Sequence, residues 1–348
     1  AEHVVGALPG AEAVLGEGAD VHVVVDQHRN TGERSRQRAG HVEGLHPAVE
    51  VRCGADRPLH RIDDAGSADA DSAQVLDRAE VPHHGGHGIH MVNCTEDPRV
   101  ADCILTYNKK SGIEILGGHD IVVNANHFEE NWDGLRCIDA FNLCMNGNNI
   151  DDHLGNGVII ENTYGSVLSG NMIEECNGTA IILDRDCYGI TLSANVIAHH
   201  LKGGIDLRDA CGCTLSANTF VLAHEFSVRV GKDSERNTIS GNTFCNTYIG
   251  AGKDKRPAEA KTPMGIDAGT GVLVEGGVNG LILNGNTFSG LSTAAVWSRG
   301  VVKNVMITCN LCMDIGRKLA KKSAGFDLTP KSGVLIKDNL EETPTPEP

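Results

Sequence analysis

The segments LSGNMI (168–173), LSANVI (192–197), LSANTF (215–220) and ISGNTF (239–244) decide the fold, because they repeat one pattern around a single asparagine. Related segments extend the series in both directions. The eight aligned asparagines are Asn126, Asn148, Asn171, Asn195, Asn218, Asn242, Asn286 and Asn310. Their spacings are 22, 23, 24, 23, 24, 44 and 24 residues. Only the spacing of 44 departs from the period, and it is longer than the others by about one loop of 20 residues. A fixed period of this length indicates a repeat architecture.

A second motif follows the asparagines, mostly nine residues later, and consists of a small residue and then alternating apolar positions. Examples are GIEI (112–115), GVII (157–160), AIIL (180–183) and GIDL (204–207). Strict alternation over four or five residues is typical of a half-buried β-strand. Three short strands in each repeat, joined by tight Gly/Asn corners, predict an all-β solenoid of 22–24-residue coils that stack at about 4.8 Å. A leucine-rich repeat would need an LxxLxL run and a helical half, and the sequence has neither.

The asparagine column has a structural explanation. An asparagine at a corner tolerates left-handed backbone geometry, and its amide can hydrogen-bond the same amide in the coils above and below. We therefore interpret the column as an internal ladder and not as a binding site. Cys187 and Cys211 are expected to share another interior column as small apolar residues. The sequence leaves open whether any of the 12 cysteines form disulfides.

The amino-acid composition divides the chain into two parts. Residues 1–84 contain no Lys, Phe, Tyr or Trp, yet they hold 8 of the 16 histidines. Valine-rich runs at 22–26 and 48–52 are consistent with strands. Three interpretations of 1–84 stay open: a disordered leader, atypical capping coils, or a wrong-frame translation. We predict the solenoid at 85–340 and a Pro/Thr/Glu-rich tail at 341–348.

Charge and hydropathy exclude several classes of partner. The formal net charge of −16 argues against a nucleic-acid or anionic-membrane partner. No apolar run approaches 18 residues, which argues against a transmembrane helix. We expect a monomer.

Candidate functional residues follow from the alternation of inward-facing and outward-facing positions in the second motif. Positions two and four after the small residue face outward, which stacks Glu161, Asp184 and Arg208 in consecutive coils. Asp206 and Arg229 lie beside them. Carboxylates in one column would be about 5 Å apart, a separation that suits a pair of glycosidase acids or a hard cation such as Ca²⁺. The alternative is a row of solvated cross-strand ion pairs.

The repeat resembles the right-handed parallel β-helix family of pectate lyases, polygalacturonases and alginate epimerases, over residues 88–340. The resemblance implies a substrate groove along the outer face of the first strand, with the LSxN segment as the second strand and the NTF segment as the third. Lyases of this family use acidic rows to hold Ca²⁺ and an arginine as the base. The resemblance therefore implies Asp184, Asp206 and Glu161 as catalytic acids and Ca²⁺ ligands, with Arg208 as the base.

Other residues near this row are predicted to bind substrate. They are Arg185, Arg229, Asp209, Lys232 and Trp297. Two long loops add basic clusters at 253–261 and 317–322, which favour an anionic polysaccharide as the partner.

Signatures of individual enzymes in the family are poorly met. GHG at 86–88 precedes the repeated segments and DDH at 151–153 falls in a loop, so we interpret both matches as accidental. The epimerase motif DPHD is absent. Two functions stay open: a lyase or glycoside hydrolase that binds and cleaves an acidic polysaccharide, or a non-catalytic surface or glycan-binding solenoid. The resemblance predicts a secreted or cell-surface location.

Overall fold

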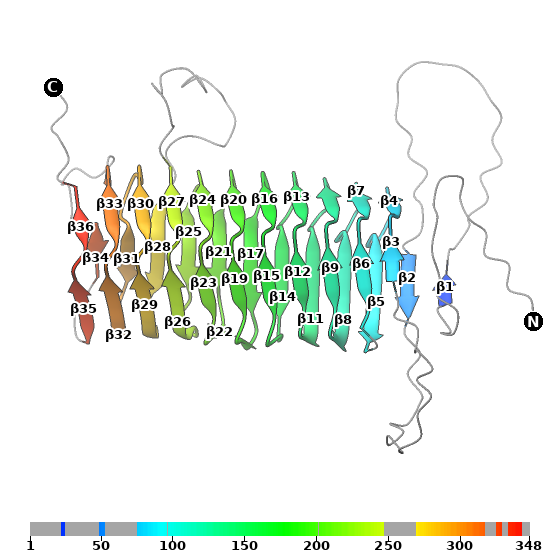
Figure 1. The fold of residues 1–348 in the computed structure, drawn as a ribbon, viewed down its shortest axis with the longest axis horizontal. Helices are drawn as coiled ribbons and strands as arrows, with labels where there is room; N and C mark the ends of the chain where they lie inside the picture. The colour runs from blue at the N-terminus through cyan, green and yellow to red at the C-terminus, as the bar shows by residue number, and fades with distance from the viewer. Residues whose placement is uncertain are drawn as a thin grey trace, which may run out of the picture.

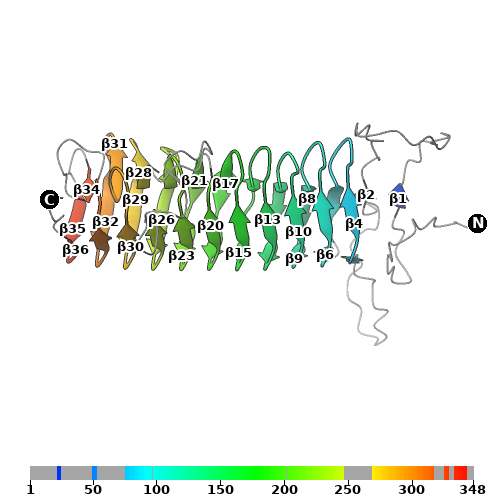
Figure 2. The ribbon, with the colours of Figure 1, turned by 90° about the horizontal axis from the view of Figure 1, so that it is seen from above.

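The computed structural model describes residues 22–24, 49–52, 75–95, 97–200, 202–246, 269–316, 325–328 and 333–342. These residues form strands, turns and corners, and the described part of the chain contains no helix. Three long sheets run along one axis, and successive coils add a strand to each of them (Figure 1, Figure 2). The predicted parallel β-helix is confirmed.

The first sheet is built from the second motif, in which alternating apolar positions follow a small residue (the GIxL motif), and it has 12 strands. In order they are β1 (His22–Val24), β2 (Val49–Arg52), β5 (Ile89–Cys94), β8 (Ile113–His119), β11 (Leu135–Phe141), β14 (Val158–Glu161), β17 (Thr179–Asp184), β21 (Gly203–Leu207), β25 (Phe226–Val230), β28 (Thr270–Glu275), β31 (Val296–Arg299) and β34 (Phe326–Asp327). β1 and β2 pair antiparallel, and β2 joins β5 in parallel. Both expected strands of the valine-rich runs are therefore present.

The second sheet is built from the LSxN motif and has 11 strands. They are β3 (Val75–Asp77), β6 (Arg99–Ala101), β9 (Val122–Asn124), β12 (Cys144–Asn146), β15 (Val167–Ser169), β19 (Thr191–Ser193), β23 (Thr214–Ser216), β26 (Glu235–Ser240), β29 (Asn279–Asn284), β32 (Lys303–Thr308) and β35 (Val334–Lys337).

The third sheet is built from the segment after each asparagine and also has 11 strands. They are β4 (Glu80–Pro82), β7 (Ile104–Thr106), β10 (His127–Glu129), β13 (Asn149–Asp151), β16 (Met172–Glu174), β20 (Val196–Ala198), β24 (Thr219–Val221), β27 (Thr243–Cys245), β30 (Thr287–Ser289), β33 (Leu311–Met313) and β36 (Leu340–Glu341). A small fourth sheet pairs β18 (Cys187–Tyr188) with β22 (Ala210–Cys211).

The core is a set of columns, because parallel strands in register place the same repeat position in each coil at the same point of the interior. Phe220, Phe244 and Phe288 show this, with ring centroids 4.8 and 4.5 Å apart and nearly parallel rings. All three are fully buried. Complete burial of such a side chain contributes roughly 1.5–3 kcal/mol relative to leaving it in water.

The predicted asparagine ladder is present. The Nδ2 of Asn171 donates to the Oδ1 of Asn195 at 2.9 Å, and the backbone N of Asn171 donates to the same oxygen at 3.0 Å. The pattern repeats from Asn126 to Asn310, and Asn339 extends it by one coil. The expected left-handed geometry belongs to a neighbouring residue: it is Ala194, immediately before Asn195, whose φ is 55°. The asparagine can therefore keep an ordinary backbone while its amide bonds along the axis.

No disulfide joins the cysteines of the described segments. Burial raises the pKa of Cys137 and Cys187 to about 12, so both thiols stay protonated at neutral pH. The expected column of Cys187 with Cys211 is wrong, because Cys187 pairs with Ala210 and Tyr188 pairs with Cys211. The corner after Asp184 contains one extra residue, which displaces Cys187 by one position.

A second ladder lines the corner that follows the third sheet. The Nδ2 of Asn108 donates to the Oδ1 of Asn131 at 2.7 Å, and the backbone N of Asn131 donates to the Nδ1 of His153 at 3.1 Å. Two coils further on, the Nε2 of His200 donates to a backbone carbonyl at 3.0 Å. Burial lowers the pKa of His153 to about 3 and that of His200 to about 4, so both are neutral at pH 7.

Candidate functional site

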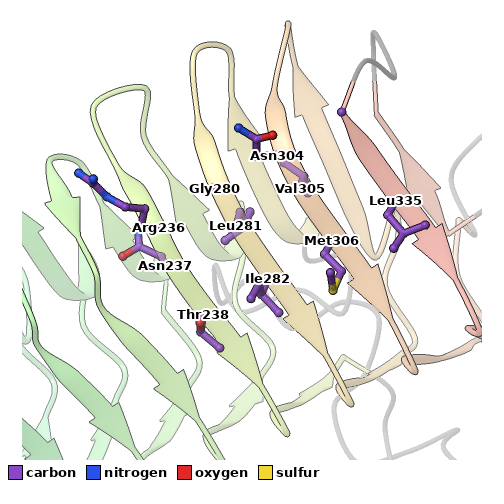
Figure 3. A pocket seen from close by; sticks show the side chains of 11 residues that line it. Arg236, Asn237, Thr238, Gly280, Leu281, Ile282, Asn304, Val305, Met306 and Leu335 are labelled. Atoms are coloured by element: carbon purple, nitrogen blue, oxygen red, sulfur yellow. The ribbon is translucent and has the colours of Figure 1, made fainter.

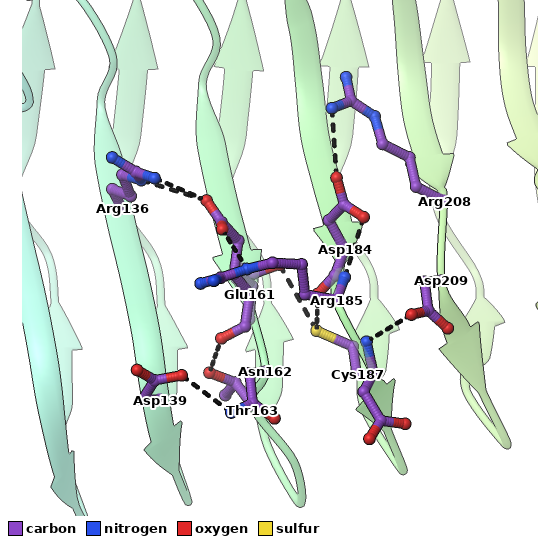
Figure 4. Close-up of polar contacts among 12 residues, drawn as sticks. Arg136, Asp139, Glu161, Asn162, Thr163, Asp184, Arg185, Cys187, Arg208 and Asp209 are labelled. Atoms are coloured by element: carbon purple, nitrogen blue, oxygen red, sulfur yellow. Dashed lines mark hydrogen bonds and ion pairs between the residues drawn. The ribbon is translucent and has the colours of Figure 1, made fainter.

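The predicted outward row lies on the first sheet. Glu161 and Asp184 are direct neighbours across β14 and β17, and Asp206 and Arg229 are direct neighbours across β21 and β25. The register follows from the alternation of the GIxL motif, because one face of each strand packs into the core. Figure 4 shows the central part of this row, with its acids and arginines directed toward one another between strands.

Ion pairs connect the row from coil to coil. Glu161 accepts from Arg136 at 2.9 Å and contacts Arg185 at 2.6 Å. Asp184 contacts Arg208 at 3.4 Å (Figure 4). Arg208 also donates to Asp206 at 2.9 Å. Further along the axis, Arg229 contacts both Asp206 and Glu275 at 3.3 Å, and Arg299 contacts Glu275 at 3.5 Å.

The arginines cover the carboxylates. We define the arginine row as Arg136, Arg185, Arg208, Arg229 and Arg299. Their side chains are between 36% and 54% exposed, whereas the acids that pair with them are between 2% and 31% exposed. The first sheet therefore presents guanidinium donors to solvent, each held by a carboxylate beneath it. Guanidinium groups recognise carboxylates and phosphates in a bidentate geometry.

Asp206 is the most enclosed acid of the row, with 2% of its side chain exposed. Its Oδ2 accepts from Arg208 and Arg229. Its Oδ1 is buried and has no hydrogen-bond partner. A buried carboxylate oxygen without a donor is costly, so Asp206 is held in place at the expense of one unsatisfied oxygen.

The environment of Arg208 bears on its predicted role as a base. Partial burial alone lowers the pKa of the guanidinium, but its hydrogen bonds and ion pairs with Asp206 and Asp184 outweigh this, and the net pKa is raised above the ordinary value. A guanidinium that stays protonated cannot accept a proton. The geometry therefore favours anion binding by Arg208 over proton abstraction.

The remaining predicted residues are spread over a wider area. Arg185 belongs to the arginine row, although it comes from the corner after β17 and reaches back to Glu161. Asp209 also lies at a corner, where it accepts from the backbone N of Asp186 at 2.8 Å (Figure 4). Lys232 is strongly exposed and contacts Asp233 at 3.8 Å. Trp297 lies on β31, with the guanidinium of Arg299 5.2 Å from its ring centroid.

A cluster at the N-terminal end of the same face was missed by the sequence reasoning. His87 and His90 contact the carboxylate of Glu114 at 3.0 and 3.4 Å, and Arg136 approaches its other oxygen at 3.8 Å. The segment GIHM (88–91) has the small-then-alternating pattern of the second motif, 24 residues before Gly112. Extending the motif series by one repeat would have placed His90 in the outward row.

Stacked acids occupy the outer side of the third sheet. We define the acidic stack as Glu129, Asp151 and Glu174, which are in register on β10, β13 and β16, together with the corner residues Glu130, Asp152 and Glu175. Burial raises the pKa of Asp151, Asp152 and Glu174, and neighbouring carboxylates raise it further. Tyr107, His127 and His199 lie beside the stack.

The described residues of the two acidic regions lack the arrangement of a metal centre. Within the described residues, no group of three or more His, Cys, Asp or Glu side chains has an arrangement that could hold a metal ion. Guanidinium groups already pair with Glu161, Asp184 and Asp206, so these carboxylates do not fit the expected Ca²⁺ site as they stand. Calcium binding stays a prediction.

A hollow of about 470 Å³ lies on the outer face of the second sheet (Figure 3). Its floor is a column of Thr238, Ile282, Met306 and Leu335, one residue from each of four coils. Arg236 is the ionisable residue in its lining. This surface lacks the acids and bases that a hydrolytic or eliminating site needs.

The basic clusters at 253–261 and 317–322 lie outside the described residues, so the structure does not place them relative to the row. Since the described residues form no helix, they include no candidate for a membrane-spanning helix.

The fold and the repeat place the chain in a known family. The model of the right-handed beta helix region matches residues 71–244, which is half of the chain, and the chain belongs to this family. A search of curated proteins finds no significant sequence match.

Among solved structures, the chain is similar to a double mutant of the periplasmic alginate epimerase AlgG, with a TM-score of 0.55 and 11% identity over 78% of this chain and 75% of that one. A single mutant of AlgG gives a TM-score of 0.54 at 11% identity, over the same shares of the two chains. An alginate lyase from Paenibacillus sp. str. FPU-7 has a TM-score of 0.47 and 12% identity, over 75% of this chain and 99% of that one. At these identities the similarity concerns the fold.

Proposed function

We propose that the chain binds an acidic polysaccharide along the arginine row of the first sheet. The observation that carries the proposal is the difference in exposure between the arginines and the acids beneath them. The acids orient the guanidinium groups and leave part of each one free for a ligand. A polymer with one carboxylate per sugar could engage several arginines at once, which multiplies weak contacts.

The fold is in keeping with this proposal, since alginate is an acidic polysaccharide and an alginate epimerase has a similar fold. A secreted or cell-surface location and a monomeric state stay predictions.

Binding is tested by titrating the full chain with polymannuronate, polygalacturonate and neutral dextran. We expect the two polyuronates to bind, with affinity that falls as salt rises, and dextran not to bind. Arg208→Ala should weaken binding at least about tenfold, because a hydrogen bond to a charged group contributes about 1.5–3 kcal/mol. Arg236→Ala is the matched control, since Arg236 is exposed on the second sheet and contacts Glu235. An equal loss in both variants, or equal binding of dextran, would refute the proposal.

Cleavage of the bound polymer is a second candidate function, favoured by the buried, partnerless Oδ1 of Asp206. Asp206, with Asp184 and Glu161, would form the acid set predicted from the sequence, and Arg208 would hold the sugar carboxylate. Asp206→Asn should then abolish the appearance of new reducing ends and unsaturated ends while binding persists. The assay is run with Ca²⁺ and with a chelator, which also tests the predicted calcium requirement. A polymer that binds but stays intact supports the non-catalytic solenoid.

A further inference from the structure

The histidine cluster at the N-terminal end of the first sheet has the arrangement of an acid–base centre. His90, Glu114 and Arg136 are direct neighbours in register on β5, β8 and β11. His87 enters from the segment just before β5, and its ring stacks on that of His90 with centroids 5.6 Å apart. The other three side chains converge on the carboxylate of Glu114, which is 11% exposed.

Glu114 holds the two imidazoles in different ways. The Nε2 of His87 lies 3.0 Å from its Oε2. Burial lowers the pKa of His87 to about 4, and the positive charges of Lys110, His90 and Arg136 contribute to the shift. At neutral pH His87 is therefore uncharged. It contacts the carboxylate of Glu114 without neutralising its charge.

His90 is the member of the cluster that can exchange a proton with a ligand. Its Nε2 is buried without a hydrogen-bond partner, and the Oε2 of Glu114 lies 3.4 Å from it. The side chain as a whole is 26% exposed, twice as much as that of His87. The exposed part therefore belongs to the side of the ring that carries Nδ1. A carboxylate behind one imidazole nitrogen orients the ring and stabilises the imidazolium when the other nitrogen takes a proton.

Arg136 completes the arrangement. It approaches the Oε1 of Glu114 at 3.8 Å, so its guanidinium and the ring of His90 lie on either side of one carboxylate. It is 39% exposed and forms the first member of the arginine row. A sugar carboxylate bound to Arg136 would bring the neighbouring ring carbon toward His90.

We propose that His90 is the general base and acid for cleavage of an acidic polysaccharide, with Glu114 as its positioning residue and Arg136 as the ligand of the sugar carboxylate. The inference rests on the proposed function, because it needs the polymer to bind along the arginine row.

The step balances within the cluster and the polymer. His90 Nδ1 takes the proton from the ring carbon that bears the carboxylate. The electron pair of that C–H bond forms a C=C bond to the adjacent ring carbon. The glycosidic C–O bond at that adjacent carbon breaks, with its electron pair on oxygen. The His90 imidazolium then returns its proton to this oxygen. The products are an unsaturated uronate end and a new hydroxyl end, and no external oxidant, reductant or water is consumed.

The chain contains a matched control for this cluster. His127 lies on the third sheet with its Nε2 3.4 Å from the Oε2 of Glu129, the same separation as that between His90 and Glu114. Both side chains of the control pair are about 40% exposed, and they lie on a different sheet from the arginine row. A histidine beside a glutamate is therefore present at both places, whereas the glutamate of the first-sheet pair is enclosed and has an arginine beside it.

The experiment measures polymer binding by calorimetry and unsaturated ends by ultraviolet absorbance in the full-length chain, with polymannuronate and polygalacturonate as substrates. His90→Gln should keep the affinity within about twofold and reduce the rate at least about 100-fold, the usual contribution of a general acid or base. His127→Gln should change neither. Glu114→Gln should reduce the rate and move the acidic limb of the pH–rate profile to lower pH, because the imidazolium loses its counter-charge.

The outcomes separate the two proposals. If the wild-type chain binds neither polymer, the proposed function fails. If it binds but forms no unsaturated ends, or if His90→Gln keeps the wild-type rate, the inference about His90 is overturned while binding stands. Loss of cleavage in Asp206→Asn but not in His90→Gln would also overturn it, and would place the chemistry at Asp206. Circular dichroism and the thermal midpoint establish that each variant is folded.

Discussion

The outer faces of the first and third sheets both stack residues of successive coils, but they stack different patterns of charge. On the first sheet, acids alternate with arginines, and Glu161, Asp184 and Asp206 each contact at least one guanidinium. On the third sheet, Glu129, Asp151 and Glu174 stand directly above one another. The spacing and register are the same in both, so the coil does not require either arrangement. A parallel β-helix tolerates a column of like charges, and the alternation on the first sheet is a property of its sequence.

The comparison also shows a difference in burial. Asp206 is enclosed and depends on its arginines, whereas the acidic stack is half-buried and reduces its repulsion through solvent and raised pKa values. Enclosed charges need partners, whereas partly solvated ones tolerate their absence. Removing charge should therefore destabilise the first face and stabilise the third.

The largest expected effect comes from removing both arginines that contact Asp206. The double variant Arg208→Met with Arg229→Met would leave an enclosed carboxylate without a cation, a change that typically costs about 3–5 kcal/mol. We expect a marked drop in the urea midpoint at pH 7. Arg236→Met, on the second sheet, should change it little. If the double variant is as stable as the control, the pairing on the first sheet does not support the enclosed acid.

Several features of the comparison could be predicted from the sequence. The periodicity of the asparagines and the alternation of the GIxL motif place Glu161 beside Asp184 and Asp206 beside Arg229, and the structure confirms both pairs. These positions follow from backbone register, which a period of two determines.

Other features could not be predicted, because they depend on corners and on long side chains. Arg185 leaves a corner with φ of 51° and turns back to Glu161, a contact that strand parity does not describe. The corner after Asp184 contains two successive left-handed residues, Arg185 and Asp186, which displaces Cys187 from the column of Cys211. The His90 cluster was missed for a different reason, since its strand belongs to the repeat but lies one coil before the series began.

The next largest expected effect is the loss of folding stability in acid. This loss comes from buried histidines, and it must be known before the acidic stack on the third sheet is titrated. His153 and His200 have a pKa of about 3 and about 4 in the folded chain, below the ordinary 6.5. Below pH 6.5 the unfolded chain binds more protons, so each histidine lowers stability as pH falls from about 6.5 toward 4. The expected loss is about 2 kcal/mol per histidine between pH 7 and pH 5. His87, with a pKa of about 4, contributes a similar loss, so three histidines act together. His153→Asn would continue the second ladder and should remove about a third of their combined loss.

Denaturation of the wild-type chain and of His153→Asn at pH 5 and pH 7 measures this slope. His127→Asn serves as the comparison, because His127 is about 40% exposed. An unchanged slope in His153→Asn would mean that the buried histidine does not govern the acid response.

The two smallest expected effects on stability have opposite signs. Together they test the difference between the first and third sheets most directly. Asp151→Asn removes a like charge from between Glu129 and Glu174 and should stabilise the chain at pH 7 by about 0.2–1 kcal/mol. Glu161→Gln removes the partner of Arg136 and Arg185 and should destabilise it by a similar amount.

The sign for the acidic stack follows from the raised pKa of Asp151. Between the ordinary carboxyl pKa and this raised value, the folded chain binds more protons than the unfolded chain, so stability falls as pH rises. Asp151→Asn should remove part of that fall. Added salt should shrink the effect of both variants by screening. Effects of the same sign in the two variants would contradict the distinction between the faces.

The step from Asn242 to Asn286 has a practical consequence. These residues are 44 apart in sequence, yet their amide hydrogen bond is 3.0 Å long, as in coils of ordinary length. Loop closure becomes only about 0.6 kcal/mol more costly with each doubling of length. The register of the coils therefore tolerates an insertion of about one loop of 20 residues at that corner. An epitope or a small folded domain with adjacent termini could be grafted between β27 and β28, which would make the rod a carrier with an attachment point at a known height along its axis.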